Sequence, residues 1–204
     1  MKILLIDDNE RLTQIYQMII NKEGHQTAIE LNSENGLERI RTEKPDIVLL
    51  DIMMEPLTGW EVLQQIRGDA ELSDIPVIIL TGKVMTMEEA LRYGMQIDGF
   101  VMKPLERSML VTAIEEVWEI LTDCEARYTR AIDAGLHEEK AAECRRMIRK
   151  RRILTYLKEI LERQERIVNL RPDEQSDMKD SIEELRKMIE TEYKGFAQGE
   201  ISCP

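Results

Sequence analysis

The sequence has few of the features that mark secreted, disulfide-rich or membrane-spanning proteins. Its 204 residues include only three cysteines, Cys124, Cys144 and Cys203, and their spacing suits no metal site. No apolar run approaches the ~18 residues that a membrane-spanning helix needs. After Met1 and Lys2, only four apolar residues precede two aspartates, and no cleavage site follows, so there is no signal-peptide pattern. We therefore expect a cytoplasmic protein with no membrane partner. We expect the first two cysteines to be small core residues.

Basic residues are also fewer than acidic ones, and almost all of this difference lies in the first part of the chain. The formal net charge is −12. Residues 1–121 carry 11 Lys and Arg against 22 Asp and Glu, whereas residues 122–204 carry 17 against 18. An acidic surface repels the nucleic acid backbone, so the first part is not expected to bind nucleic acid itself. The balanced second part leaves that question open.

Four short apolar runs each end on polar or charged groups. The runs are residues 2–6, 46–50, 76–80 and 100–102. Apolar runs of this length without alternation predict strands that are buried on both faces of a parallel sheet. The groups that follow them are Asp7-Asp8, Asp51, Thr81-Gly82 and Lys103-Pro104. Because open α/β folds bind their ligands at the carboxyl ends of the strands, we expect these side chains to lie together.

The chemistry of such a cluster points to a cation and a phosphoryl group. Carboxylates in close proximity repel one another, by about 4 kcal/mol per pair at about 4 Å if the effective dielectric constant is near 20. Mg²⁺, which binds one or two carboxylates plus waters, suits that cluster. Together with the ammonium of Lys103 it would neutralise a phosphoryl group arriving at Asp51, and phosphoryl transfer requires mainly positioning and charge stabilisation. Taken alone, Asp51 could instead be a structural cap of the next turn.

With these four motifs in this order, residues 1–121 resemble the receiver domain of two-component response regulators. The resemblance implies that Asp51 accepts a phosphoryl group from a partner histidine kinase and becomes an acyl phosphate. It also implies that Asp8, Asp51 and the carbonyl of Met53 ligate Mg²⁺, with Asp7 binding directly or through water. The expected metal ligands are thus Asp7, Asp8, Asp51 and Met53.

The same resemblance assigns roles to three further residues. Thr81 and Lys103 would join Asp51 in the chemistry, with Thr81 hydrogen-bonded to the phosphoryl oxygens. Phe100 would be the aromatic residue that changes rotamer with Thr81, so these two would form the switch. The Lys103–Pro104 peptide would be cis, a form that costs proline little. The protein would then promote its own phosphorylation and dephosphorylation, with no turnover of an external substrate.

The segment after Asp51 departs from the family pattern at one position. Family members usually place a proline directly after the Met-Met pair, whereas here Glu55 comes first and Pro56 follows. This difference affects the turn geometry and predicts an extra carboxylate near the metal. Glu55 would either strengthen Mg²⁺ binding or point to solvent. Because Gly59 keeps its family spacing, the site assignment is unchanged.

The periodicity between the apolar runs predicts the fold. Apolar residues recur at helical spacing within residues 11–21, 37–40, 60–67 and 86–93, and residues 25–30 predict one more strand. The strands that contain the third and fourth apolar runs are predicted to span residues 73–80 and 96–102. Five strands alternating with five helices predict an α/β domain over residues 1–121. Its five-stranded parallel sheet would be doubly wound in the flavodoxin-like order 2-1-3-4-5. Residues 122–204 would form an all-α extension.

The last helix of the α/β domain is predicted to continue into that extension. Its apolar residues keep spacings of three and four without a break: Leu110, Ile114, Val117, Leu121, Cys124, Tyr128 and Ala131. We expect a helix from about 105 to 133 that is capped by Gly135, then helices over about 137–169 and 173–193. Their stripes are too wide to stay exposed, which predicts a bundle or coiled coil within the chain or between two chains. We favour a homodimer because two-fold association is the commonest oligomer.

Two other functions remain open for the extension. Residues 145–152 contain six basic residues in eight, which could contact DNA phosphates in a transcriptional regulator. No helix-turn-helix spacing, zinc ligand set or stacking aromatic residue accompanies this run, and the solvated flank of a helix would also explain it. His137 with Glu138 could accept phosphate in a phosphorelay, although a surface or capping histidine is the simpler interpretation. We therefore favour phosphorylation-controlled self-association or binding of a protein effector.

Overall fold

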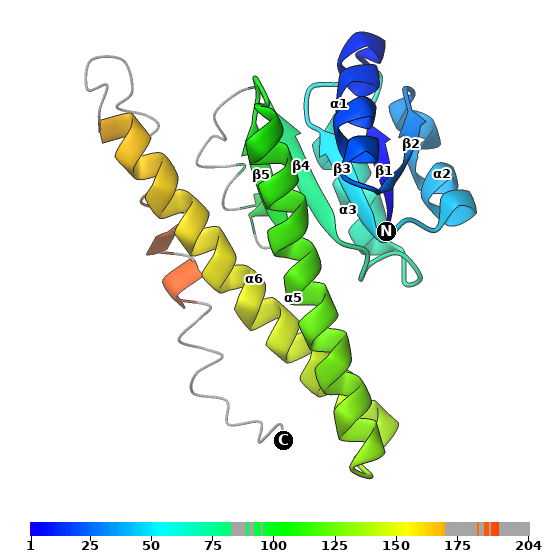
Figure 1. The fold of residues 1–204 in the computed structure, drawn as a ribbon, viewed down its shortest axis with the longest axis vertical. Helices are drawn as coiled ribbons and strands as arrows, with labels where there is room; N and C mark the ends of the chain where they lie inside the picture. The colour runs from blue at the N-terminus through cyan, green and yellow to red at the C-terminus, as the bar shows by residue number, and fades with distance from the viewer. Residues whose placement is uncertain are drawn as a thin grey trace. The chain divides into compact units, whose positions relative to one another are not determined.

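A computed structural model describes residues 1–82, 89, 92–94, 96–169, 183, 186, 187 and 189–191 of the chain. The chain divides into two compact units. The first consists of Met1–Val84 and Gln96–Ile114, and the second of Met85–Met95 and Glu115–Pro204. One long helix, α5 (Arg107–Asp133), begins in the first unit and continues into the second (Figure 1).

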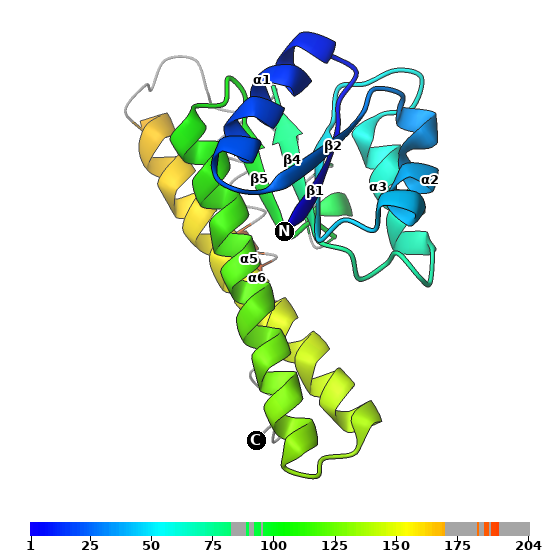
Figure 2. The same cartoon turned by 45° about the vertical axis from the view of Figure 1, so that its right-hand side comes forward.

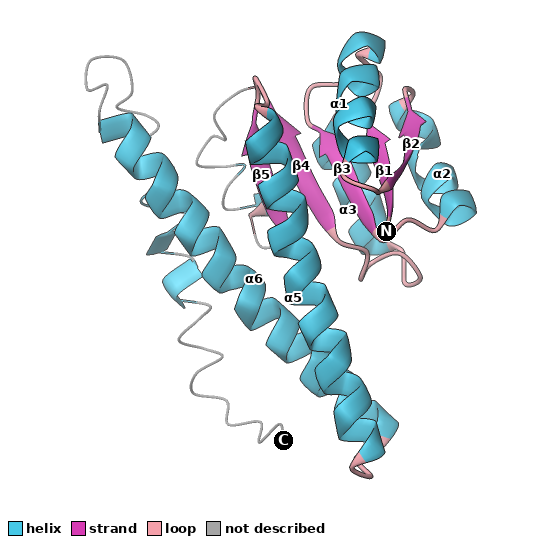
Figure 3. Ribbon diagram, viewed as in Figure 1, coloured by secondary structure: helices cyan, strands magenta, loops and turns pink. Residues whose placement is uncertain are grey.

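The first unit is built on a parallel sheet, coloured magenta in Figure 3. Its strands are β1 (Lys2–Ile6), β2 (Gln26–Glu30), β3 (Ile47–Asp51), β4 (Val77–Thr81) and β5 (Gly99–Met102). They follow the order β2-β1-β3-β4-β5, so the predicted fold class and strand order are confirmed. Every residue of β3 and β4 is buried, as expected for the central strands of a sheet that is covered on both faces.

Helices cover both faces of this sheet. The helix α1 (Glu10–Lys22) lies on one face, and α2 (Gly36–Glu43) and α3 (Gly59–Gly68) lie on the other (Figure 2). A short 3-10 helix, η1 (Ser33–Asn35), precedes α2. Side chains of Asn9 and Thr58 cap α1 and α3, and Thr58 forms a capping box with Glu61. The predicted helix over residues 86–93 lies mostly outside the described residues.

Two strands begin later than the apolar pattern predicts. β4 begins at Val77 and not at residue 73, and β5 begins at Gly99 and not at residue 96. The guanidinium of Arg67 binds the carbonyl oxygens of three residues that longer strands would contain: Ser73, Ile75 and Gln96. A hydrophobic pattern does not reveal this competition, because the side chain responsible lies on α3.

The second unit contains a helical hairpin of α5 and α6 (Glu138–Asn169). Its turn contains Gly135 at a φ of +86°, which supports the predicted helix cap. The Gly135 N–H donates to Ile132 O, and the Leu136 N–H donates to Ala131 O. Between the helices, Arg145 Nη1 lies 2.8 Å from Glu125 Oε2, and Arg152 pairs with Asp123. The helix predicted over residues 137–169 is confirmed, because α6 begins at Glu138, one residue later than predicted.

The apolar stripe of α5 is buried within this chain. Its buried positions in the second unit are Val117, Ile120, Cys124 and Ala131, and those of α6 include Ala141, Cys144, Ile153, Leu154 and Tyr156. Leu121 and Tyr128, which the heptad pattern placed in the seam, are only half-buried. The chain itself thus supplies a surface for the stripe, and a homodimer stays a prediction.

The two cysteines of this hairpin differ from each other. Cys124 is a buried free thiol, as the sequence predicts. Cys144 is buried in the core as expected, but it is also disulfide-bonded, which the sequence did not predict. The third predicted helix, over residues 173–193, lies mostly outside the described residues. Among the helices that the structure describes, none is both long and apolar enough to cross a membrane.

Candidate functional site

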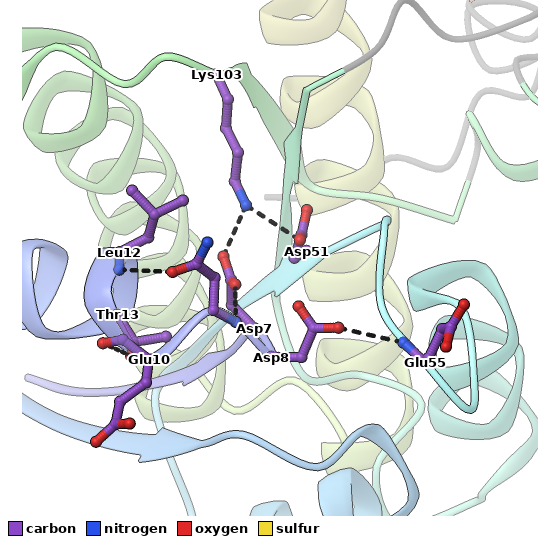
Figure 4. Close-up of polar contacts among 9 residues, drawn as sticks. Asp7, Asp8, Glu10, Leu12, Thr13, Asp51, Glu55 and Lys103 are labelled. Atoms are coloured by element: carbon purple, nitrogen blue, oxygen red, sulfur yellow. Dashed lines mark hydrogen bonds and ion pairs between the residues drawn. The ribbon is translucent and has the colours of Figure 1, made fainter.

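The carboxyl ends of four strands bring the predicted site residues to one edge of the sheet. Asp7 follows β1, Asp51 ends β3, Thr81 ends β4 and Lys103 follows β5. Asp7, Asp51 and Thr81 are buried, whereas Asp8 is exposed. Figure 4 shows Asp7, Asp51 and Lys103 directed toward one another, as the parallel sheet requires.

Lys103 connects the two buried carboxylates. Its Nζ lies 2.7 Å from Asp7 Oδ2 and 3.1 Å from Asp51 Oδ2. Its backbone N–H donates to Thr81 O at 2.6 Å, and the Lys103–Pro104 peptide is cis, as the resemblance implies. The ammonium therefore neutralises part of the negative charge at the point where a phosphoryl group would add more.

The three aspartates have the arrangement of a cation site. Asp7, Asp8 and Asp51 each offer one carboxylate oxygen, and these oxygens all lie within 4.8 Å of one another. Asp51 Oδ1 is buried, and none of the described residues donates a hydrogen bond to it, which is costly for a carboxylate oxygen. Hard divalent cations with oxygen ligands, Mg²⁺ among them, fit this donor set. The proposed role of the Met53 carbonyl stays a prediction.

Burial and charge together shift the ionisation of the site. Burial raises the pKa of the Asp51 carboxyl, and Asp7 raises it further, although Lys103 and the Met53 N–H oppose them. Burial lowers the pKa of Lys103, but its hydrogen bond to Asp7 and the charge of Asp51 outweigh this and raise it overall. The lysine is thus held in its charged form, and Asp51 binds a proton more readily than a free aspartate.

These shifts predict how stability depends on pH. Because the pKa of Asp51 is raised on folding, its contribution is fully favourable below its unfolded value near 3.8 and is lost as the pH rises through the folded pKa. The Asp51→Asn variant has no such titration. We expect the metal-free variant to be more stable than the wild type at about pH 7, with a difference that shrinks toward about pH 4. Urea denaturation with a chelator measures this, and a pH-independent difference would contradict it.

The loop between β3 and α3 contacts Asp8, the exposed aspartate of the cluster. The Glu55 N–H donates to Asp8 Oδ2 at 3.3 Å, and the Leu57 N–H donates to Ser33 Oγ at 3.0 Å. Glu55 contributes its backbone, while its side chain is exposed and points away from Asp8 (Figure 4). The expected extra carboxylate beside the metal is therefore not observed, and the alternative that Glu55 faces solvent agrees with the structure.

Tyr16 is a neighbour of the site that the sequence does not single out. It lies on α1 with 4% of its surface exposed. Burial raises the pKa of its hydroxyl, Lys103 lowers it, and Asp7 and Asp51 raise it. Because Tyr16 occupies an apolar helix position, the periodicity identifies it only as a core residue. The expected switch residue Phe100 is buried in β5, and its change of rotamer stays a prediction.

The two alternative motifs lie in the second unit. His137 is exposed just before α6, and its carbonyl accepts the Ala141 N–H at 3.0 Å, as in a helix cap. In the basic run, Arg145 pairs with Glu125 and stacks over the ring of Tyr128, with 4.7 Å between the guanidinium and the ring centre. Arg152 at the other end of the run pairs with Asp123. Both ends of the run therefore face α5.

Comparisons with known proteins agree with this geometry. The family model described as the response regulator receiver domain matches residues 3–115. Protein PilH of Pseudomonas aeruginosa is 35% identical over 118 residues, which are 57% of this chain and 96% of PilH. A solved receiver domain protein from Methanospirillum hungatei, described as CheY-like, is 25% identical with a TM-score of 0.53. That match covers 58% of this chain and 94% of the other.

Longer relatives match over only part of their length. The DNA-binding response regulator MtrA of Mycolicibacterium smegmatis is 32% identical over 113 residues, which are 55% of this chain. The match covers 48% of MtrA, so this chain spans about half the length of that relative. The family model ends at residue 115, and most of α5 and all of α6 lie beyond it.

Proposed function

This chain belongs to the response regulator receiver domain family, and on that premise we propose that Asp51 accepts a phosphoryl group from a histidine kinase in a Mg²⁺-dependent transfer. The observation that carries the proposal is the state of the Asp51 carboxylate. One oxygen is paired with Lys103 at 3.1 Å, and the other is buried and accepts no hydrogen bond from the residues that the structure describes. An oxygen without a partner retains its lone pairs for a cation or an electrophile.

The proposed transfer is a displacement at phosphorus. A carboxylate oxygen of Asp51 forms a bond to phosphorus as the bond from phosphorus to the kinase imidazole nitrogen breaks, and the imidazole leaves with that electron pair. The product is an acyl phosphate on Asp51 and a free histidine. Asp7, Asp8 and Asp51 would hold Mg²⁺, which supplies positive charge for the phosphoryl oxygens.

Two residues of the chain assist this transfer. Lys103 carries a positive charge already fixed between Asp7 and Asp51, so little reorganisation is needed when the phosphoryl group arrives. Thr81 is buried on the adjacent strand, and its hydroxyl would donate to a phosphoryl oxygen. Thr81 would also couple the phosphorylation state to Phe100, since both lie on neighbouring strands at this edge.

For the output we propose self-association or binding of a protein partner through the helical unit. The support is the continuity of α5, which runs from Arg107 to Asp133 without interruption. A displacement of its first turns is transmitted along a rigid helix without a flexible linker. DNA binding through residues 145–152 is less well supported, because Arg145 and Arg152 pair with acidic residues of α5. MtrA is named as a DNA-binding protein, but the match to this chain covers only 48% of MtrA, so that property is not carried over.

The proposal is tested by labelling with a small phosphodonor such as phosphoramidate. With Mg²⁺ we expect the wild type to incorporate one phosphoryl group and Asp51→Asn to incorporate none. Asp8→Asn should require more Mg²⁺. The matched control is Asp46→Asn, because Asp46 lies immediately before the other end of β3, where it accepts the Lys2 N–H at 2.6 Å. Full labelling of Asp51→Asn, or loss of labelling in Asp46→Asn alone, would contradict the assignment.

A further inference from the structure

A second charged network lies within the first unit, at the amino ends of β4 and β5. The site lies at the carboxyl ends of the same strands. It is centred on Arg67 in the last turn of α3, whose side chain is 17% exposed. Its Nε donates to Gln96 O at 2.7 Å, and its Nη1 donates to Ser73 O at 3.0 Å and Ile75 O at 2.7 Å. Its Nη2 donates to Asp98 Oδ2 at 3.0 Å. One guanidinium thus binds acceptors on two separate segments.

Asp98 completes the network from the other side. Its carboxylate is buried, and Oδ2 also accepts the Val77 N–H at 2.9 Å. Its own N–H donates to Val77 O at 2.8 Å. The first residue of β4 and the residue before β5 are therefore joined to each other and to α3. A lysine at position 67 could not reproduce these contacts, because an ammonium lacks the planar fork of a guanidinium.

The segments held by this network lead directly to two residues of the site. β4 ends on Thr81, and β5 is followed by Lys103. The five residue steps of extended chain from Asp98 to Lys103 span about 16 Å at about 3.3 Å per step. Among the strands that the structure describes, β5 lies at the end of the sheet and pairs with β4 alone, whereas β3, which carries Asp51, pairs with strands on both sides. The position of Lys103 along the sheet therefore depends on fewer contacts than that of Asp51.

We propose that Arg67 and Asp98 are positioning residues for the phosphoryl-transfer site, and that they act by fixing the starts of β4 and β5 and hence the placement of Thr81 and Lys103. This inference rests on the proposed function at Asp51. The pair is neutral overall and lies a full strand length away, so the fields of its two charges largely cancel at the site. Its influence is geometric. Lys103 Nζ bridges two carboxylates at 2.7 and 3.1 Å, a geometry that tolerates little displacement.

The test compares Arg67→Lys and Asp98→Asn with a matched control, Val62→Ala. Val62 is fully buried in the same helix, and its Cγ1 lies 3.4 Å from the point that a Cβ on Gly36 would occupy, away from the segments that Arg67 binds. We expect the labelling rate of both positioning variants with phosphoramidate and saturating Mg²⁺ to fall by about tenfold to a hundredfold, since a misplacement of about 1 Å can cost that much. Their affinity for Mg²⁺ should stay unchanged, because the three aspartates lie on or after β1 and β3. Val62→Ala should lose stability yet keep its labelling rate.

Amide hydrogen exchange provides a readout that does not depend on phosphorylation. In the positioning variants, the Lys103 amide, which donates to Thr81 O, should exchange faster, while amides of β1 and β3 keep their protection. In Val62→Ala no selective loss at Lys103 is expected. Equal labelling rates in Arg67→Lys, Asp98→Asn and Val62→Ala, or uniform loss of protection in all three, would overturn the inference. Absence of labelling in the wild type would instead refute the proposed function, and the exchange experiment would still decide whether the network holds β5.

Discussion

Replacing Gly59 by alanine should destabilise the first unit by about 3 kcal/mol or more, among the largest effects of a single added methyl group. A Cβ at this position would lie 2.0 Å from Asp51 O and 2.8 Å from Ile52 Cα. These are backbone atoms of β3 and its exit, so no side-chain rotation relieves the clash. The Gly59 N–H also donates to Ile52 O at 3.0 Å, which keeps α3 against the strand end. Urea denaturation of the two proteins measures the effect.

Gly68, at the other end of α3, provides the control. A Cβ there would have no atom of the described residues within 4 Å, and Gly68 is exposed. Gly68→Ala should therefore leave the protein as stable as the wild type or up to about 1 kcal/mol more stable, because alanine loses less backbone entropy in a helix. If Gly59→Ala were no less stable than Gly68→Ala, the close approach of α3 to Asp51 would be wrong.

Replacing Lys103 by methionine should destabilise the metal-free protein by about 3 kcal/mol, since removing one partner of a buried ion pair leaves an uncompensated charge. Asp7 and Asp51 would then lie together without the ammonium that bridges them at 2.7 and 3.1 Å. Mg²⁺ should restore much of this stability, because it neutralises the same carboxylates. Thermal unfolding with a chelator and with added Mg²⁺ separates the two contributions.

A surface lysine provides the comparison for this substitution. Lys2 Nζ pairs with Glu43 Oε2 at the same distance of 2.7 Å, but its side chain is 36% exposed against 14% for Lys103. Lys2→Met should cost less than about 1 kcal/mol, and Mg²⁺ should not compensate for it. Equal losses in the two variants would indicate that burial of the Lys103 bridge contributes nothing.

The site could be predicted from the sequence because each of its members directly ends or follows a short apolar run. Parallel pairing leaves little freedom in where such residues lie, so Asp7, Asp51, Thr81 and Lys103 meet once the strands are recognised. The strand order followed from the alternation of strands and helices. The long α5 was likewise visible, because an unbroken spacing of three and four carries no stop signal.

The features that the sequence did not reveal depend on single side chains from distant segments. Arg67 shortens β4 and β5 by binding carbonyls that lie 6, 8 and 29 positions away in the chain. The Glu55 backbone N–H contacts Asp8 while the Glu55 side chain is exposed, and no residue pattern encodes that difference. In the helical unit, Ile120 is the buried residue at the point where the heptad pattern placed Leu121, because two specific helices pack there. Periodicity gives the face of a helix but not its rotation to within one residue.

The proposed function depends most directly on an acyl phosphate at Asp51. Borohydride reduces such an acyl phosphate to an alcohol, which converts the modified aspartate to homoserine and marks its position permanently. After treatment with phosphoramidate and Mg²⁺, reduction and proteolysis, mass spectrometry should find homoserine at position 51 and aspartate at positions 7, 8 and 46. Homoserine at one of those other positions, or none at position 51 in a phosphorylated sample, would contradict the account.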